Sequence, residues 1–375
     1  MCNLLKESFK RLNSHFVSGL TLITLILSAM SVVKKPSLKD IAAKVGVSTA
    51  LVSYVLNNQK QGRIGQEVAQ KIRDAALSLN YRTNLIARSL KTNSTLTIGL
   101  MVPDISHPFF AGIARSVEDE ANRHGYTVCY GSTDGNPLRS RHLMDMLLNR
   151  QVDGLIIAPG EHAEMLIKSL QEQALPFVLV DRYYPDLPSN YVALDNYKAA
   201  YIAVQHLVER GYKRIGLLGY ETPLHHLNER KRGYLTALKD YKIAFTNSWL
   251  KEKGWVKEVS IANKKIEIER AVDELRLARE PVDSILFTSN RLAAAGVKHI
   301  HSLRLNVPED LALVCFDETE SLDLFQAPLT YLRQPLAEMG QQATRVLLDS
   351  IRKNNKIIQV NMEPELVIRK STLKK

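Results

Sequence analysis

The chain has 375 residues, of which 45% are hydrophobic and 24% charged, so it is long enough for more than one domain and too apolar to be mainly disordered. Its net charge of +11 is concentrated near the N-terminus, since residues 1–95 contain 14 Lys and Arg against 4 Asp and Glu. This asymmetry indicates a small basic module for a polyanion, joined to a larger domain of balanced charge. A basic surface without a partner is the alternative.

The three cysteines, Cys2, Cys129 and Cys315, are far apart in the sequence and show no metal-ligand spacing. A disulfide framework needs paired cysteines in an oxidising compartment, and a zinc site needs clustered Cys and His. We therefore expect reduced thiols in a cytoplasmic protein, with no disulfide and no zinc.

A stretch of 18 uncharged residues runs from Phe16 to Val33 and reaches the length of a membrane span. Ser and Thr residues dilute its apolar character, and Met30 lies just before the first organised sequence. We expect residues 1–33 to be an apolar extension that reflects a start assigned too early, and no membrane association. A membrane anchor and a secretory signal are the alternatives.

Residues 34–82 are predicted to form a small all-α helix-turn-helix domain. A first helix opens at Ser37, which forms a capping box with Asp40, and it ends at Gly46, because glycine adopts the left-handed conformation of a tight turn. Ser48 caps a second helix, and a third is predicted from Gln66 to Leu79. The apolar positions 38, 41, 42 and 45 of the first helix, and 52, 55 and 56 of the second, face inward.

The outward face of the second helix carries short hydrogen-bonding side chains, which suit base edges in the major groove. Basic residues elsewhere in the domain are candidates for phosphate contacts. A structural three-helix bundle would show the same inward spacing, so periodicity alone leaves both interpretations open. The candidate DNA-reading residues are Ser48, Thr49, Ala50, Ser53, Tyr54 and Asn57, and the candidate phosphate contacts are Lys44, Lys60, Arg63, Lys71 and Arg73.

Two motifs carry a family resemblance. The pattern L-K-D-I-A-x-x-x-G-V-S-x-x-x-V-S-x-V-L-N begins at Leu38, and Y-R-x-N-x-x-A-R-S-L-K-T begins at Tyr81. Together they resemble the LacI family of bacterial transcriptional regulators, and the resemblance extends over residues 36–375. It implies that Thr49, Ala50 and Tyr54 face bases, although many members have Arg where this chain has Tyr54.

The resemblance also implies that residues 83–95 form a hinge helix and linker. In such a hinge, Leu90 enters the minor groove as an apolar wedge between base pairs, with Arg88 and Lys91 beside it as phosphate anchors. Asn84 begins this hinge helix and is a further candidate DNA contact. Thr83 replaces a proline that is common in the family, which loosens the approach to the hinge.

Residues 96–375 are predicted to form an α/β core. Eight short apolar runs, from TIGLMV at 97–102 to LALVCF at 311–316, alternate with segments of helical length. Their number fits two similar lobes better than one sheet, and ligands of such folds bind at the carboxyl ends of the strands. The resemblance implies a periplasmic-binding-protein-like core of two lobes around a cleft, which forms a homodimer.

No enzymatic function is indicated by the sequence. The phosphate-binding, dinucleotide-binding, zinc-protease and serine-hydrolase motifs are all absent. The pairs His225/His226 and His299/His301 lack a spacing suited to a metal, and we expect them to be surface or packing residues. The protein is therefore predicted not to be an enzyme and to need no cofactor or metal.

Polar and aromatic groups gather where strands end, as a sugar site requires. The resemblance implies that Arg230, in R-x-x-G-[FWY], and Asp317, after a strand ending in CF, face the effector. It also places Asn196 and Gln334 near the crossovers between lobes. The candidate effector-binding residues are Phe109, Phe110, Arg182, Arg230, Arg291 and Asp317.

Arg291 departs from the family pattern, in which Asp is frequent at this position. With Arg230 and Arg182 nearby, it favours an anionic effector such as a sugar phosphate or a uronic acid. An ion pair with Asp317 or Glu318 as a structural contact is the alternative.

The sequence as a whole predicts a homodimeric transcriptional repressor of carbohydrate-related genes, controlled by a sugar or sugar derivative and bound to a pseudopalindromic operator. A solute-binding or sensor protein whose N-terminal module does not bind DNA is the rival, and it predicts no steep salt dependence of DNA affinity.

Overall fold

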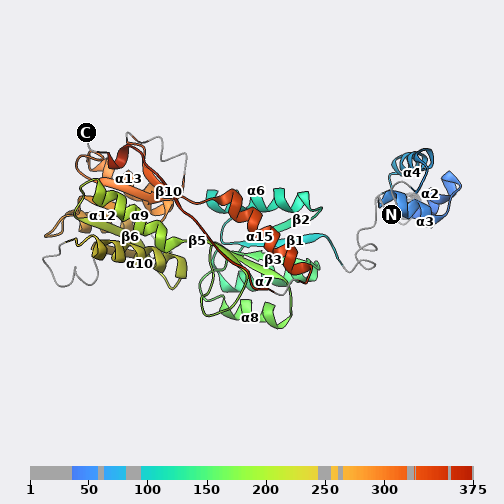
Figure 1. Ribbon diagram of the computed structural model, residues 1–375, viewed down its shortest axis with the longest axis horizontal. Coiled ribbons are helices and arrows are strands. Elements are labelled where there is room, and N and C mark those ends of the chain that lie inside the picture. The colour runs from blue at the N-terminus through green and yellow to red at the C-terminus, as the bar shows by residue number, and fades with distance from the viewer. Residues whose placement is uncertain are drawn as a thin grey trace, which may run out of the picture. The chain divides into compact units, whose positions relative to one another are not determined.

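The computed structural model describes residues 36–57, 63–81, 94–243, 255–260, 265–318, 325, 327–353 and 356–373 (Figure 1). The chain divides into two compact units between Lys91 and Thr92, within the segment predicted as hinge and linker. The N-terminal extension and the predicted hinge contacts Asn84, Arg88 and Leu90 lie outside the described residues. None of the described helices has the length and apolar character needed to cross a membrane.

The small unit contains three helices, α2 (Leu38–Val45), α3 (Thr49–Leu56) and α4 (Gln66–Ser78). The Asp40 carboxylate accepts a hydrogen bond from the Ser37 backbone N–H at 2.7 Å, and the Ser48 hydroxyl accepts one from the Leu51 N–H at 3.2 Å. Gly46 ends α2 with a φ of 77°. The three predicted helices are confirmed, and their shared core is centred on the fully buried Ile41, Val52 and Ile72.

The large unit contains two six-stranded sheets. The first has the order β11-β5-β4-β3-β1-β2 with all neighbours parallel, and the second has the order β12-β10-β9-β8-β6-β7 with only β12 antiparallel to its neighbour. The strands of the first sheet are β1 (Thr97–Val102), β2 (Thr127–Ser132), β3 (Gly154–Ile157), β4 (Phe177–Val180), β5 (Tyr191–Leu194) and β11 (Gln359–Met362). Those of the second are β6 (Ile215–Glu221), β7 (Trp255–Ser260), β8 (Ser284–Phe287), β9 (Ala312–Phe316), β10 (Thr330–Arg333) and β12 (Glu365–Val367).

Helices cover both faces of each sheet, and each lobe buries apolar side chains on the two sides of its strands. The first lobe has α6 (Pro108–Arg123), α7 (Pro137–Asn149), α8 (Glu164–Glu172) and α15 (Leu336–Ile351). The second has α9 (Asn196–Glu209), α10 (His225–Asp240), α12 (Lys265–Arg276), α13 (Asn290–Ser302) and the short helix η1 (Lys370–Thr372).

The chain passes between the lobes three times. It leaves the first lobe after β5 at Asp195, returns after β10 at Gln334, and leaves again between β11 and β12 at Glu363 and Pro364. The predicted two-lobed core is therefore confirmed, and Asn196 and Gln334 do lie at crossovers.

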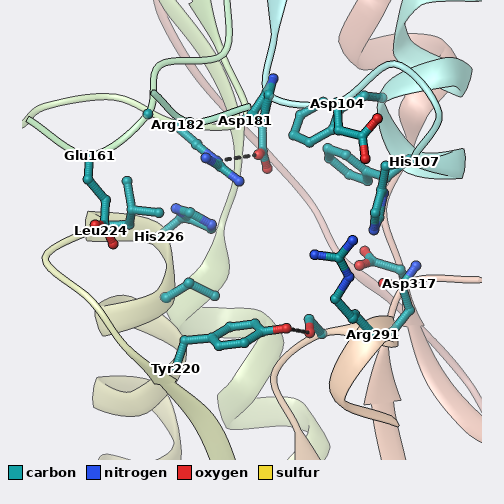
Figure 2. A pocket seen from close by; sticks show the side chains of 18 of the residues that line it. Asp104, His107, Glu161, Asp181, Arg182, Tyr220, Leu224, His226, Arg291 and Asp317 are labelled. Atoms are coloured by element: carbon teal, nitrogen blue, oxygen red, sulfur yellow. Dashed lines mark hydrogen bonds and ion pairs between the residues drawn. The ribbon is translucent and has the colours of Figure 1, made fainter. Parts of the chain in front are cut away.

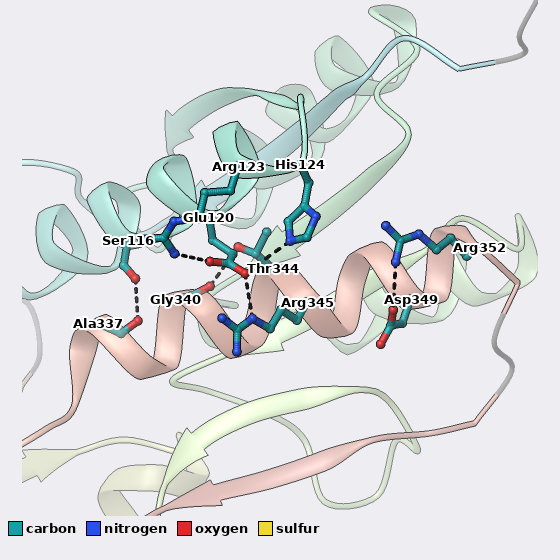
Figure 3. Close-up of polar contacts among 10 residues, drawn as sticks. All are labelled: Ser116, Glu120, Arg123, His124, Ala337, Gly340, Thr344, Arg345, Asp349 and Arg352. Atoms are coloured by element: carbon teal, nitrogen blue, oxygen red, sulfur yellow. Dashed lines mark hydrogen bonds and ion pairs between the residues drawn. The ribbon is translucent and has the colours of Figure 1, made fainter. Parts of the chain in front are cut away.

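Within the first lobe, α6 packs closely on α15 (Figure 3). A Cβ atom at Gly340 would come within 2.6 Å of the Ser116 Cβ, so only glycine permits this approach without displacement. Beside this contact, the buried Glu120 carboxylate on α6 accepts a hydrogen bond from the Arg345 Nε on α15 at 2.7 Å. One charged group thus joins the helix that follows β1 to the helix that follows the second crossover.

Candidate functional site

A cavity of about 410 Å³ lies between the two lobes, at the carboxyl ends of the strands (Figure 2). Residues that follow β1, β3 and β4 line it from the first lobe, and residues that follow β6, β8 and β9 line it from the second. This is the position at which open α/β sheets bind their ligands. All six predicted effector residues, Phe109, Phe110, Arg182, Arg230, Arg291 and Asp317, line this cavity.

Two buried aspartates occupy equivalent positions in the two lobes. Asp181 follows β4 with a φ of 66°, and Asp317 follows β9 with a φ of 72°. Their backbone N–H groups donate to the carbonyls of Val192 and Leu332 at 2.9 and 3.0 Å, which extends each sheet by one bond beyond the strand. Left-handed backbone is uncommon at residues other than glycine, and Asp is among the side chains that adopt it most readily. Burial raises the pKa of the Asp181 carboxyl, although Arg182 lowers it in part.

Arg230 lines the cavity and is only 3% exposed. Its Nε donates to the Asn196 side-chain oxygen at 2.8 Å and its Nη1 to the Thr288 carbonyl at 2.6 Å. The guanidinium carbon lies 3.8 Å from the centre of the Phe316 ring, which is a cation–π contact. Two of its five N–H donors are therefore used within the protein, and the stacked cation offers a ligand its charge and its remaining donors.

Arg182 and Arg291 approach the cavity from opposite lobes (Figure 2). The Arg182 Nε lies 3.3 Å from an Asp181 carboxylate oxygen. Within the described part of the chain, no hydrogen bond or ion pair involves Arg291, which is exposed at the start of α13. The predicted alternative of a structural pair is not found there, because Glu318 instead accepts hydrogen bonds from Arg333 and Tyr331.

Several buried polar atoms beside the cavity have no hydrogen-bond partner among the described residues. They include His226 Nδ1 and Gln334 Oε1, whose side chains are 5% and 6% exposed. Burial, together with the nearby Arg182 and Arg230, lowers the pKa of His226 well below its usual value, so this imidazole is neutral near pH 7. A buried polar group without a partner is costly, and a ligand can supply the missing bond.

Phe109 and Phe110 form the apolar part of the wall. Both are buried at the start of α6, and their rings meet edge to face with centroids 5.0 Å apart. Such a surface can cover the apolar face of a sugar ring while the aspartates bind its hydroxyl groups.

The second candidate surface is the outward face of α3. Ser48, Thr49 and Ala50 are exposed, and Ser53 and Tyr54 are half-buried farther along the helix. Asn57 ends the helix, and its side-chain amide donates to the Ser53 carbonyl at 2.8 Å, so this amide already has an internal partner. The apolar residues of α3 face the core of the small unit, which leaves the short polar side chains available to a partner.

Comparison with known proteins identifies both units of the chain. Residues 37–84 match the model of the bacterial regulatory proteins of the lacI family, and residues 204–372 match a periplasmic binding protein-like domain. The HTH-type transcriptional repressor PurR of Mannheimia succiniciproducens is 33% identical, over 90% of this chain and 99% of that protein. The chain belongs to the LacI family.

Solved structures agree with this membership in the LacI family. The lac repressor dimer bound to operator and an anti-inducer matches with a TM-score of 0.79 at 22% identity, over 91% of this chain and 100% of that chain. A putative ribose operon repressor from Burkholderia thailandensis matches with a TM-score of 0.64 at 26% identity, over 72% of this chain and 98% of that chain. The two-lobed fold is thus that of LacI-family repressors.

This LacI-family chain is a transcriptional repressor and not an enzyme, because its relatives are transcriptional repressors and its N-terminal unit matches the family of bacterial regulatory proteins. No cluster of three or more His, Cys, Asp or Glu in the described residues is arranged to hold a metal ion. The position of His226 in the wall of the cavity was not predicted, because the sequence indicated only a surface or packing residue. Its only sequence signal was its place four residues before Arg230 on a helix that begins at a strand end.

Proposed function

We propose that the protein is a homodimeric repressor of carbohydrate-related genes that binds a pseudopalindromic operator and responds to a sugar or sugar derivative in the cleft. The observation that carries this proposal is the cleft itself, which joins two carboxylates, a buried arginine and unpartnered polar atoms to an aromatic wall. Hydroxyl groups of a sugar satisfy such acceptors, and a sugar ring covers such a wall.

On the DNA side, Ser48, Thr49, Ala50, Ser53 and Tyr54 contact base edges or the adjoining backbone from α3. Short side chains at the start of a recognition helix allow close approach to the major groove. Basic side chains of the same unit contact phosphates. On the same proposal, Asn57 contacts DNA at the end of α3, and Asn84, Arg88 and Leu90 act at the minor groove.

Control by the effector follows from its position between two lobes joined by three crossovers. A ligand that contacts Asp181 of one lobe and Asp317 of the other favours the arrangement in which both contacts form. If this arrangement has a different operator affinity, effector and operator are coupled, and each changes the binding of the other by the same factor.

The first test is DNA binding by the full chain. Duplexes that bind the wild-type protein are selected from a random pool, and their affinity is measured by fluorescence anisotropy at several salt concentrations. We expect affinity to fall steeply with salt, because basic residues displace counterions from phosphates. We expect Ala50→Asp to weaken binding by at least about tenfold, since it places a carboxylate against DNA.

Leu77→Asp is the matched control, because it introduces the same negative charge at a residue of α4 in the same unit that is 75% exposed. Circular dichroism confirms that both variants fold. If the wild-type protein selects no sequence, or binds DNA with no dependence on salt, the solute-binding rival replaces this proposal.

A further inference from the structure

We propose that the effector is a sugar that carries a phosphate or carboxylate group, and that this anion lies between Arg182 and Arg291. This inference rests on the proposed function, because it specifies the ligand of the same cleft. It is carried by the pairing of the charges that line the cavity, by the direction of two guanidinium groups and by the position of the remaining acceptors.

Each carboxylate that lines the cavity already has a partner. Asp181 pairs with Arg182, and the Asp317 carboxylate accepts a hydrogen bond from the Gln334 amide at 2.6 Å. The others are Asp104, which accepts from the Ser106 N–H and hydroxyl, Glu161, which accepts from the Thr222 hydroxyl, and Asp134, which pairs with Arg139. Arg291 is the one charged side chain of the cavity that makes no hydrogen bond or ion pair among the described residues. Its charge still reaches Asp104, whose carboxyl pKa is lowered first by hydrogen bonds from Ser106 and to a smaller extent by Arg291.

The two arginines are placed to hold one anion from both sides. Both guanidinium groups point into the cavity in Figure 2, Arg182 from the loop after β4 and Arg291 from the first turn of α13. The Arg182 Nε faces an Asp181 carboxylate oxygen at 3.3 Å, and its Nη1 reaches the Pro159 carbonyl only at 3.4 Å, so the outer edge of the guanidinium group is the part left for a ligand. Guanidinium groups bind phosphate and carboxylate oxygens in a fork, so both side chains have donors available for an anion.

The backbone favours negative charge at the same place. The 16-residue helix α6 and the 13-residue helix α13 both begin at the cavity wall. The N-terminus of a helix carries partial positive charge and free N–H groups, which stabilise an anion. His107, the N-cap of α6, also has a buried Nδ1 without a partner among the described residues, and Figure 2 shows its ring above Arg291.

The rest of the cavity indicates that the ligand is more than an anion. Gln334 Oε1 needs a hydrogen-bond donor, and Asp317 and Asp181 have further acceptor capacity. A fully ionised phosphate or carboxylate donates no hydrogen bond, whereas each hydroxyl group of a sugar can donate one. An anionic sugar therefore matches a cavity that has hydrogen-bond acceptors in one part and the guanidinium groups of Arg182 and Arg291 in another.

The test is thermal unfolding of the full chain with matched ligands. Glucose, galactose, fructose and ribose are each compared with their phosphates, the first two also with their uronic acids, and inorganic phosphate is added alone. We expect at least one anionic sugar to raise the midpoint, and its neutral parent to need a higher concentration for the same shift. Arg291→Gln should weaken the binding of the anionic sugar by about 10- to 100-fold, as expected for loss of charge-assisted hydrogen bonds. The unfolding midpoint without ligand should stay unchanged.

Lys298→Gln is the matched control, because it removes one positive charge from an exposed position of the same helix outside the cavity, and it should respond as wild type. The inference is overturned if neutral sugars act as well as anionic ones, if inorganic phosphate acts equally well, if Arg291→Gln changes nothing, or if no anionic sugar shifts the midpoint. Operator binding, measured on the same samples, decides the proposed function separately.

Discussion

His226 shows how the meeting of two lobes changes the properties of a single residue. Its imidazole is 5% exposed, lies near Arg182 and Arg230, and leaves Nδ1 without a partner among the described residues. Burial beside two cations disfavours the protonated form, so its pKa is lowered. The His226 imidazole therefore binds a proton less readily in the folded protein than in the unfolded chain.

This residue should make stability fall in mild acid. Because its folded pKa lies below its unfolded value near 6.5, its full contribution is present above pH 6.5 and is lost as the pH falls below it. Wild type should lose more unfolding free energy between pH 7 and pH 5 than His226→Gln, by up to about 1.4 kcal/mol per pH unit for one proton. Urea unfolding at a series of pH values measures this difference.

His142→Gln, at an exposed site on α7, controls for the loss of any histidine, and it should follow wild type. His206 and His225 also have lowered pKa values because of burial, so wild type keeps some pH dependence in every variant. Identical profiles for wild type and His226→Gln would show that His226 is not neutral and buried in solution.

At the scale of elements, the contact between α6 and α15 depends on Glu120, which is 2% exposed (Figure 3). Hydrogen bonds from Arg345 and Arg123 lower the pKa of its carboxyl from about 4.5 to about 2, and burial opposes them only in part. The stabilisation is therefore present above pH 4.5 and is lost as the pH falls towards 2.

Glu120→Gln should reduce the unfolding free energy by about 1 to 3 kcal/mol at neutral pH, since it removes hydrogen bonds between charged groups and a buried carboxylate. The difference in unfolding free energy between wild type and Glu120→Gln should shrink as the pH falls from 4.5 towards 2, where the wild-type carboxyl also loses its charge. Glu118→Gln, an exposed neighbour on α6 that pairs with Arg115 at 3.5 Å, should change stability little. A deficit that is the same at every pH would contradict the role of the charge.

The elements also show what the sequence can predict. All eight apolar runs became strands, and seven of them lie between two neighbours in a sheet, where strands are buried on both faces. The eighth, β2, lies at a sheet edge and is less buried. Strands β7, β11 and β12, which lie at sheet edges and contain polar residues, were not predicted, and neither was the short β10. Among cavity residues, Arg230 and Asp317 belong to recognisable motifs. The lowered pKa of His226 depends on burial and, in part, on Arg182 of the other lobe, which no local sequence pattern encodes.

At the scale of the whole molecule, the two lobes are linked by more than the three crossovers. The Thr222 hydroxyl, after β6, donates a hydrogen bond to the Glu161 carboxylate, after β3. The ring of Tyr183 in the first lobe meets the ring of His225 in the second, with centroids 5.0 Å apart. These contacts are few and lie beside the cavity, so a ligand that bridges the lobes competes with a modest set of interactions.

The cores of the two units suggest that the large unit folds without the small one. Among the described residues, each buried cluster consists of residues from one unit, either 38–81 or the chain after residue 97. Just before β1, the Ser94 hydroxyl donates to the Asp153 carboxylate at 2.5 Å, and the N–H of Thr95 donates to the same group at 2.8 Å. These bonds tie residues 94 and 95 to the loop that precedes β3, so a fragment of the large unit should include them.

A fragment of residues 94–375 should unfold in one transition at the midpoint of the main transition of the full chain, keep the same response to effector and lose operator binding. A fragment of residues 98–375 lacks the partners of Asp153 and should be less stable by about 1 to 3 kcal/mol, because a half-buried carboxylate is left unsatisfied. Scanning calorimetry measures the unfolding midpoints of both fragments. In a unit of this size, each kcal/mol of lost stability lowers the midpoint by about 2 to 4 °C. If the fragment of residues 94–375 also has a lowered unfolding midpoint, or if effector does not shift that midpoint, the small unit contributes to the fold of the core. The DNA-binding and effector-binding units would then not be independent.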